Sequence, residues 1–320
     1  MRVLFLGTPE FAVATLKALI ACQDFEVVGA VCQPDRPSGR GNKLTQPPVK
    51  IVALEHDIPV LQPEKLAKAP EIVEQMKALK PDVIVMVAFG QILKKAVLEL
   101  APYGVINLHG SLLPKLRGAA PINWSIINGE KVTGVTTMVT EAGVDTGPML
   151  LKAEVPIGND MNAEELAHEM ASIGAPLVVE TLRGLKAGTV KPQAQNDAEA
   201  TYAPIMTKEM GAIDWNKPAQ EIHNLVRGLY PWPGTYSQFR DGTLKIIKTT
   251  LPSGLNLEAA NEAGVVSRHQ EHILVSCGNG GKESIVLLQV QPANKAKMNA
   301  RDWYNGLRLT SPERFGSIHV

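Results

Sequence analysis

Short apolar runs alternate with segments of helical spacing through the first half of the chain. Runs of about four to eight apolar residues bounded by turn signals are typical of buried strands, and apolar residues three and four apart are typical of helices. Strands separated by single helices form a parallel sheet. We therefore expect an α/β, doubly wound, Rossmann-like and mostly parallel sheet. The expected strands lie at 3–7, 26–33, 82–90, 104–109 and 134–140, and the expected helices at 11–22, 69–80, 91–100, 118–130 and 162–188.

The pattern changes after residue 188. Residues 189–206 show little periodicity and are predicted to be a linker. An amphipathic helix at about 217–229 follows, and then several short strands separated by turns. Such spacing favours a small β-barrel with flanking helices. We therefore expect two domains, 1–188 and 207–320, joined by the linker.

Composition and charge exclude few classes of protein. The chain has 320 residues, of which 45% are apolar, and its net charge is zero, so no global field points to nucleic acid or membrane. Lys and Arg exceed Asp and Glu by 13 to 10 over residues 208–320, a weak basic bias. Three widely spaced cysteines without a CxxC pair favour a reducing, cytoplasmic setting. No stretch has the length of a membrane span, so we expect no membrane partner.

Two polar residues interrupt the apolar strand "VINLH" at alternate positions. Asn107 and His109 share one face because side chains alternate across a strand. They stand at the carboxyl end of that strand, where doubly wound sheets bind ligands. Asp145 lies in a Gly-rich turn after the next strand and could reach the imidazole. The three would supply a donor, a titratable ring and an orienting carboxylate, although a buried structural Asn–His pair is the plainer alternative.

Other motifs carry weaker signals. A lone Gly7 after the first strand lacks the three glycines of a dinucleotide site, and Ser111 lacks a nucleophile elbow. His269 and His272 have metal-like spacing but no third ligand clusters with them, so a polar turn is favoured and no metal is expected. The turn from Pro114 to Gly118 is either a connector or a pocket wall.

A basic segment follows the second expected strand. Residues 33–48 are rich in Pro and Gly and are predicted to be an irregular loop. The segment around it carries Arg36, Arg40, Lys43 and Lys50 against only Asp35. A cationic loop suits a polyanionic partner, and the bland alternative is a solvated surface loop.

Four motifs together resemble one family. These are "NLHGSLLPKLRGAAPINW" (107–124), "GVDTGPML" (143–150), "QPDRPSGRG" (33–41) and "PWPGTY" (231–236). The chain is similar to the formyltransferases that use 10-formyltetrahydrofolate, and the basic loop and second domain point to the branch that acts on initiator methionyl-tRNA. The likeness runs from about residue 1 to about residue 310. Relatives acting on glycinamide ribonucleotide or amino sugars share the SLLP turn.

The resemblance implies a role for each motif. Residues 1–188 would be the catalytic domain and 207–320 an OB-like barrel that helps hold the tRNA. Arg40 would contact tRNA, with Arg36 and Lys43 beside it. The family's catalytic set falls on Asn107, His109 and Asp145, and its folate contacts fall on Ser111, Leu112, Leu113 and Pro114 and on Phe89, Gly90, Gln91 and Ile92. We expect a monomer with no metal that serves translation initiation.

The implied reaction is attack of an α-amine on a formyl carbon. The amine has a pKa near ~8, so it needs only mild base help. Asn107 can donate to the negative oxygen that develops, as oxyanion holes do. His109, held by Asp145, can donate to the same oxygen or relay a proton. Three alternatives stay open: an amino-sugar formyltransferase, a nicotinamide-dependent oxidoreductase and a noncatalytic RNA-binding module.

Overall fold

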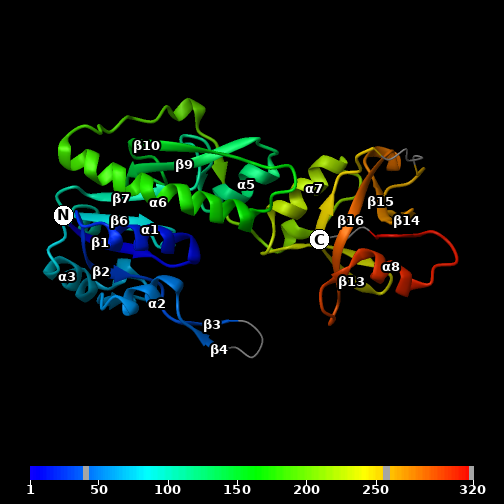
Figure 1. Cartoon of the computed structure of the whole chain (residues 1–320), viewed down its shortest axis with the longest axis horizontal. Coiled ribbons are helices and arrows are strands. Elements are labelled where there is room, and N and C mark those ends of the chain that lie inside the picture. Colours follow the sequence, from blue (N-terminus) through cyan, green and yellow to red (C-terminus); the bar gives the residue numbers. More distant parts are fainter. Residues whose placement is uncertain (39–42, 255–259, 317–320) are drawn as a thin grey trace. The chain divides into compact units, whose positions relative to one another are not determined.

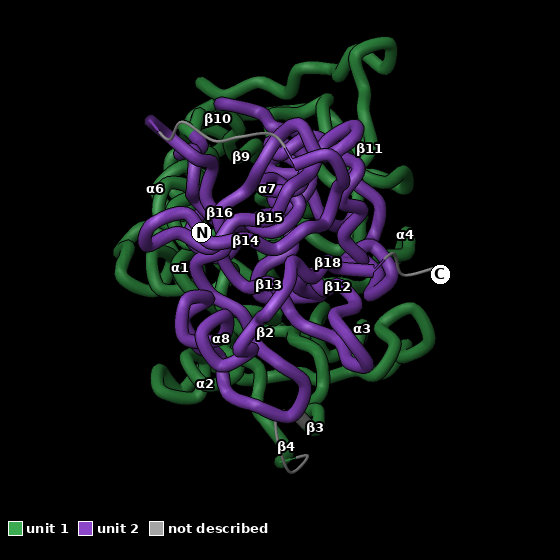
Figure 2. Tube along the Cα trace, turned by 90° about the vertical axis from the view of Figure 1, so that its right-hand side faces the viewer, with its two compact units in different colours: residues 1–118, 132–156, 167–202 green, residues 119–131, 157–166, 203–320 purple. Residues whose placement is uncertain are grey.

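The computed structural model describes residues 1–38, 43–254 and 260–316, and the chain divides into two compact units. Unit 1 comprises residues 1–118, 132–156 and 167–202; unit 2 comprises residues 119–131, 157–166 and 203–320. Figure 2 colours the two units separately. Two short segments that precede residue 167 therefore belong to the second unit. Within the described ranges no helix is long and apolar enough to cross a membrane.

Unit 1 is built on a seven-stranded sheet with the order β10-β9-β7-β6-β1-β2-β5 (Figure 1). The five strands from β7 to β5 are parallel, and β9 and β10 join antiparallel at one edge. The prediction of a mostly parallel, doubly wound sheet is therefore confirmed. The strands are β1 (Arg2–Gly7), β2 (Glu26–Val31), β5 (Val60–Leu61), β6 (Val83–Val87), β7 (Val105–His109), β9 (Val132–Val139) and β10 (Met149–Pro156).

The central strands of unit 1 form because nearly every side chain on them is apolar and buried. In β1 the residues from Val3 to Leu6 are fully buried, as expected for a parallel sheet covered on both faces. One apolar cluster joins Leu4 and Leu6 to Met76 of α3 and Val97 of α4. The helices of this unit are α1 (Glu10–Ala21), α2 (Pro48–Glu55), α3 (Pro70–Ala78), α4 (Lys95–Leu98) and α6 (Ala163–Ala187), the last of which begins in unit 2.

Three local predictions in unit 1 differ from the structure. The helix expected at 91–100 shortens to α4, because Gln91 bonds to the Leu66 amide and the Pro63 carbonyl instead of joining a helix. Helix α2 was not predicted, since Pro47 and Pro48 at its start are typical of a loop, yet proline suits the first helical position. Strand β10 was likewise not predicted; it begins at Met149, within the Gly-rich segment that was expected to be a turn.

The prediction that 33–48 lacks regular structure is wrong for its described part. β3 (Arg36–Ser38) and β4 (Lys43–Thr45) pair antiparallel as a small hairpin. In a two-stranded ribbon each strand is an edge strand, so a proline at position 37 is tolerated. The tip of the segment lies outside the described residues.

Unit 2 is a curled antiparallel sheet with helices beside it. Its order is β12-β13-β16-β15-β14-β18, with β17 also pairing with β16. A bridge between Gln238 of β12 and Gly316, just after β18, links the two ends of the sheet. The predicted barrel-like second part is confirmed. The elements are α5 (Pro121–Ile127), α7 (Ala219–Gly228), β12 (Thr235–Phe239), β13 (Gly242–Thr250), β14 (Val265–His269), β15 (His272–Cys277), β16 (Glu283–Pro292), β17 (Met298–Asn299), α8 (Ala300–Leu307) and β18 (Glu313–Arg314).

Aromatic rings fill the core of unit 2. Trp215 stacks on Phe315 with ring centroids 4.9 Å apart, and Phe239 packs edge-on against Trp303 at 5.1 Å. Each such pair adds about 0.5–1.5 kcal/mol beyond the area it buries. A small sheet thereby gains a well-defined core.

Short pieces complete the chain between these elements. Arg117 and Gly118 form the two-residue strand β8 (Arg117–Gly118), which pairs with β11 (Tyr202–Ala203). Residues 189–201 contain one 3₁₀ turn, from Asp197 to Glu199, and an isolated antiparallel bridge from Gln193 to Met149, and are otherwise irregular.

Candidate active site

The candidate site begins at the carboxyl end of β7. Asn107 and His109 lie on one face of that strand and are 7% and 5% exposed. Leu108 points to the opposite face, where it meets α6 at Gly174; a Cβ on that glycine would lie 2.6 Å from the leucine side chain. Close packing behind the strand therefore fixes the two polar side chains in front of it.

The His109 ring has an acceptor at each nitrogen. Nδ1 lies 3.5 Å from an Asp145 carboxylate oxygen, and Nε2 lies 3.0 Å from the Leu116 carbonyl oxygen. A carbonyl can only accept, so Nε2–H is the donor of the second contact. The structure thus brings Asp145 to the imidazole, as the order of the strands suggested. The bond to Leu116 was not anticipated.

Asp145 is held by backbone contacts on both sides. Its carboxylate accepts a hydrogen bond from the Gly118 amide at 2.9 Å, and its backbone has a φ of 51°, a conformation that Asp tolerates better than most residues. The Gln195 side-chain amide donates to the carbonyls of Asp145 and Gly147, each at 2.7 Å. A Cβ at Gly147 would lie 1.9 Å from the Val139 carbonyl oxygen, so only glycine fits there.

Asn107 differs from its neighbour because its side-chain amide has no hydrogen-bond partner in the described parts of the chain. In those parts, the hydroxyls of Thr15 and Thr140 are the only side-chain polar atoms that are both fully buried and without a partner. The Asn107 amide has no partner either, so its atoms must remain accessible. A side chain 93% buried that still reaches open space with free donors is suited to meet a ligand. Asn107 therefore offers an unpaired donor at this end of the sheet.

The turn after β7 is fixed by Thr136. Its hydroxyl donates to the Ser111 carbonyl at 2.7 Å and accepts from the Leu113 amide at 3.1 Å. Ser111 is fully buried and its own hydroxyl donates to the Lys115 carbonyl, which leaves no free nucleophile. Leu113 is 1% exposed, packed with two methionines, so of the four predicted folate contacts only Leu112 and Pro114 have partly accessible side chains.

The loop after β6 borders the point where strand order reverses. From β1 the chain builds outward to β2 and β5 and then returns to β6 on the other side, and ligands of doubly wound sheets bind at such a switch point. Phe89 is 2% exposed in the apolar core, and Gln91 is used inside the fold. Gly90, with a φ of 78°, and Ile92, 81% exposed, are accessible. The other two predicted contacts of this loop could reach a ligand only through their backbone.

The basic hairpin carries less free charge than its composition suggested. Lys50 pairs with Asp35 at 2.8 Å, and Arg36 pairs with Glu64 of a neighbouring segment at 2.5 Å. Lys43 is exposed and has no ion pair with any described residue. Arg40 lies outside the described residues. The unpaired cation of the described hairpin is therefore close to its tip.

Sequence reasoning missed the residues that hold the site together. The buried Arg117 guanidinium donates to Gln195 at 3.0 Å and to Asp197 at 2.7 Å, and Gln195 in turn holds the Asp145 turn. Gln195 and Asp197 lie 78 and 80 positions after Arg117 in the chain. No local pattern marks them, because residues 189–206 lack periodicity; an arginine within an apolar turn was the one available signal.

The cysteine at this end of the sheet is poorly suited to nucleophilic attack. Burial raises the pKa of the Cys32 thiol to about 11, so the thiolate needed for attack is scarce near neutral pH. Within the described residues, no three His, Cys, Asp or Glu side chains gather to hold a metal ion. The side chains at hand suit proton transfer and hydrogen bonding.

Comparison with known proteins places the chain in a family. Residues 1–182 match the formyl transferase model and residues 205–308 match the formyl transferase C-terminal domain. Methionyl-tRNA formyltransferase of Ruminiclostridium cellulolyticum is 48% identical over 99% of this chain and 100% of its own length. That of Trichlorobacter lovleyi is also 48% identical, over 95% of this chain and 94% of its own.

The chain belongs to the methionyl-tRNA formyltransferase family. The resemblance drawn from its motifs is thereby confirmed, and with it the class of enzyme. Among solved structures, the N-formyltransferase of Helicobacter canadensis, in complex with folinic acid and dTDP-3-aminofucose, matches with a TM-score of 0.67 at 20% identity. That match covers 91% of this chain and 98% of the other. The shared fold therefore includes residues of unit 1 and of unit 2.

Proposed function

We propose that this chain transfers the formyl group of 10-formyltetrahydrofolate to the α-amine of initiator methionyl-tRNA, for translation initiation. Full-length similarity to methionyl-tRNA formyltransferases supports the reaction. The observation that carries the mechanism is the placement of Asn107, His109 and Asp145 at one end of β7. In the reaction the amine nitrogen bonds to the formyl carbon, the bond from that carbon to N10 of the folate breaks, and the amine proton ends on N10.

Asn107 is assigned to the formyl oxygen. As the amine adds, that oxygen takes up negative charge, and a side-chain amide donor pointing at it lowers the barrier. The amide has no partner in the described structure, so it can turn to the oxygen without breaking a protein hydrogen bond. This freedom makes Asn107 the main stabiliser of the developing charge.

His109 and Asp145 are assigned to proton handling. The carboxylate, 3.5 Å from Nδ1, orients the ring and stabilises it whenever it carries a second proton. Nε2–H is donated to the Leu116 carbonyl in the ligand-free chain, and contacts of catalytic groups in ligand-free structures commonly rearrange in the reacting complex. Exchange of that carbonyl for the formyl oxygen would let His109 assist Asn107.

The accessible groups around the switch point fit a flat co-substrate. Ile92 and Leu112 offer apolar surface, and Gly90 exposes its backbone. Phe89 and Leu113 are buried, so their proposed part is to shape the loop and the turn from behind. Ser111, Pro114 and Gln91 likewise contribute through the backbone that they hold in place.

The remaining assignments concern the whole chain. Residues 1–188 are proposed as the catalytic domain and 207–320 as a domain that holds the tRNA, with Arg40, Arg36 and Lys43 touching the tRNA from the hairpin. We propose that the enzyme works in the cytoplasm, as a monomer.

One assay tests the function. Purified chain is mixed with 10-formyltetrahydrofolate and either methionyl-tRNA, uncharged tRNA, free methionine or an amino sugar, and the formylated product is measured. The proposal expects product with methionyl-tRNA and none with uncharged tRNA. Equal turnover of free methionine or of an amino sugar would replace the proposed substrate by a small amine.

A further inference from the structure

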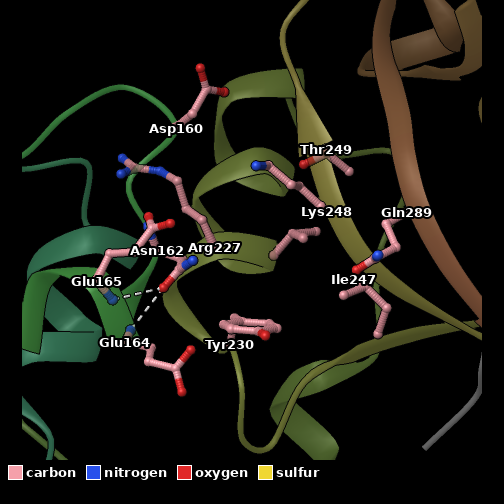
Figure 3. Close-up of a pocket in the computed structure, with 11 residues that line it drawn as sticks. Asp160, Asn162, Glu164, Glu165, Arg227, Tyr230, Ile247, Lys248, Thr249 and Gln289 are labelled. Carbon is pink, nitrogen blue, oxygen red and sulfur yellow. Dashed lines mark hydrogen bonds between the residues drawn. The ribbon is translucent and has the colours of Figure 1, made fainter. Parts of the chain in front are cut away.

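A polar pocket is lined only by residues of unit 2, and none of them is assigned to formyl transfer. Its volume is about 250 Å³. Three parts of the unit line it: the loop and helix start at 160–165, helix α7 with the residue after it, and the paired strands β13 and β16. Figure 3 shows Lys248 and Tyr230 reaching into the space between these elements.

A double irregularity in the sheet aims the strand residues into this pocket. Ile246 pairs with Val290 and Lys248 with Gln289, so β13 has one extra residue, Ile247, between two pairs. The register then shifts back, because the next pair joins Thr249 to Leu287. In a regular strand three successive side chains alternate faces, yet residues 247–249 all line the pocket. Bulges of this kind commonly re-aim side chains at functional sites.

Two residues of the pocket could contact a ligand directly: Lys248 with its ammonium and Tyr230 with its aromatic ring. Lys248 is exposed, and its ammonium has no partner among the described residues. The Tyr230 ring carries the Lys297 ammonium 5.1 Å from its centroid, and that ammonium is 3.5 Å from the phenol oxygen. Two positions along, Trp232 is 56% exposed between two prolines, which restrict its backbone. An exposed tryptophan with a restricted backbone is suited to stack against an aromatic ring or a nucleic-acid base.

The acidic residues at the opposite wall are mostly engaged within the fold. Asn162 and Glu165 cap the start of α6: the Asn162 side chain accepts from the amides of Glu164 and Glu165, and Glu165 accepts from the Asn162 amide (Figure 3). Asp160 accepts from the Thr250 hydroxyl. Glu164 keeps a carboxylate with no partner in the described structure. It can accept from the amino group of a base, as carboxylates do from cytosine.

Arg227 adds positive charge from beneath. It is 5% exposed, donates to the carbonyls of Gly158 and Met161 and to Asn224, and makes no ion pair within the described ranges. A guanidinium stays charged, so Arg227 adds positive charge to this wall of the pocket, although the Asp160 carboxylate acts on it from the same wall. Its hydrogen bonds fix the loop that forms the acidic wall.

We propose that this pocket and the adjoining Trp232 bind an unpaired nucleotide of the tRNA substrate. The backbone phosphate lies against Lys248 and Lys297, and bases stack on Tyr230 and Trp232. Glu164 meets a base edge together with Gln289, whose side-chain amide lines the pocket and has no hydrogen-bond partner among the described residues. Cations for phosphate, aromatic faces and acceptors for a base edge together describe a nucleotide better than a bare anion, which Glu164 would repel. The inference rests on the proposed function, because tRNA is what supplies the nucleotide.

Binding of uncharged tRNA to single variants tests the surface. Tyr230→Ala and Trp232→Ala should each raise the tRNA Kd by roughly 5- to 150-fold, the usual effect of losing one stacked base. Tyr230→Phe should bind as the parent does, since it keeps the ring. Lys248→Ala should weaken binding and flatten its salt dependence, whereas Lys282→Ala, an exposed lysine of the same unit without a partner in the described part, should do neither. Tyr103→Ala, an exposed aromatic of unit 1 before β7, is the matched aromatic control.

Tryptophan emission gives an independent reading. Trp215 and Trp303 are 4% and 7% exposed, so Trp232 is by far more open to quenching by iodide than either of them. Added tRNA should protect the emission, and the protection should shrink in Trp232→Phe. Parent-like tRNA affinity in both alanine variants of the rings would overturn the inference, as would saturation by free mononucleotides with no effect of tRNA. Formyl transfer by the parent is measured separately, so failure of the proposed function and failure of this surface give different results.

Discussion

At the scale of single residues, the alternation of one strand accounts for most of the candidate site. Asn107 and His109 could be placed together from sequence because they are two positions apart on a strand, and Asp145 because its turn follows the neighbouring strand. The Leu116 carbonyl could not be predicted, since a backbone group carries no sequence signature. That carbonyl accepts the hydrogen bond of His109, so of the two polar side chains only Asn107 is without a partner among the described residues.

Asn107→Ala is expected to lower kcat by about 10²–10³-fold, the usual loss for one oxyanion donor. The change removes donors that have no partner in the described fold, so it leaves no buried group unpaired and the melting temperature should stay near that of the parent. Steady-state kinetics with both substrates measure it. Turnover within a few-fold of the parent would remove Asn107 from the transition state.

Asp145→Asn is expected to keep the fold and slow transfer strongly. The amide can still accept from the Gly118 amide, but it does not stabilise a doubly protonated ring as a carboxylate does. The pH–rate profile of the variant should therefore differ from that of the parent in height and shape. Superimposable profiles would show that Asp145 is not coupled to His109.

At the scale of elements, the strands and helices with strong periodicity were predicted well and the short ones were not. β1 and β7 match the segments expected at 3–7 and 104–109, because short apolar runs bounded by turn signals mark them clearly. α2 and the hairpin of β3 and β4 escaped prediction, because two prolines stand at the start of α2 and the hairpin lies in a Pro- and Gly-rich segment. Packing and pairing with the rest of the chain outweigh such local signals.

The hairpin yields a prediction about charge. Arg40→Ala is expected to raise the KM for methionyl-tRNA and to leave the apparent affinity for 10-formyltetrahydrofolate unchanged. One lost phosphate contact also reduces the slope of log affinity against log salt by about 0.9 or less. Lys50→Ala serves as the control, because that lysine is already paired with Asp35. Equal tRNA KM values in the Arg40 variant and the parent would leave a solvated loop with no part in recognition.

At the scale of the whole molecule, the two-part organisation followed from the change of periodicity near residue 188. Its finer division did not: residues 119–131 and 157–166 group with unit 2, and nothing in their local pattern marks this. Long-range contacts decide it, such as those that His223 and Arg227 of α7 make with the backbone of the 158–161 loop. The boundaries at 188 and 207 stay a prediction.

His223 links the stability of unit 2 to pH. Burial lowers the pKa of its imidazole below the usual 6.5, although its bond to the Asn159 carbonyl acts in the opposite direction. Between the folded and unfolded pKa values of this imidazole, the unfolded chain binds more protons than the folded chain. The free energy of unfolding therefore keeps its full value above about pH 6.5 and decreases as the pH drops toward the folded pKa.

Replacement of this histidine should remove its share of that dependence. In His223→Gln the loss of stability between pH 7.5 and pH 5.5 is expected to be smaller than in the parent, as measured by denaturant midpoints. His56→Gln, at an exposed histidine, should leave the dependence unchanged. Identical losses in the His223 variant and the parent would contradict the assignment.

The central claim is that the polar end of β7 carries out formyl transfer, and the single-turnover rate of His109→Ala tests it most directly. Saturating 10-formyltetrahydrofolate and excess enzyme are mixed rapidly with methionyl-tRNA, so that binding and product release drop out of the measured rate. We expect the parent to formylate the tRNA and the variant to be slower by about 10²-fold or more, in keeping with general acid–base and oxyanion contributions, with tRNA affinity unchanged. A variant that transfers the formyl group at the parent's rate would contradict the account.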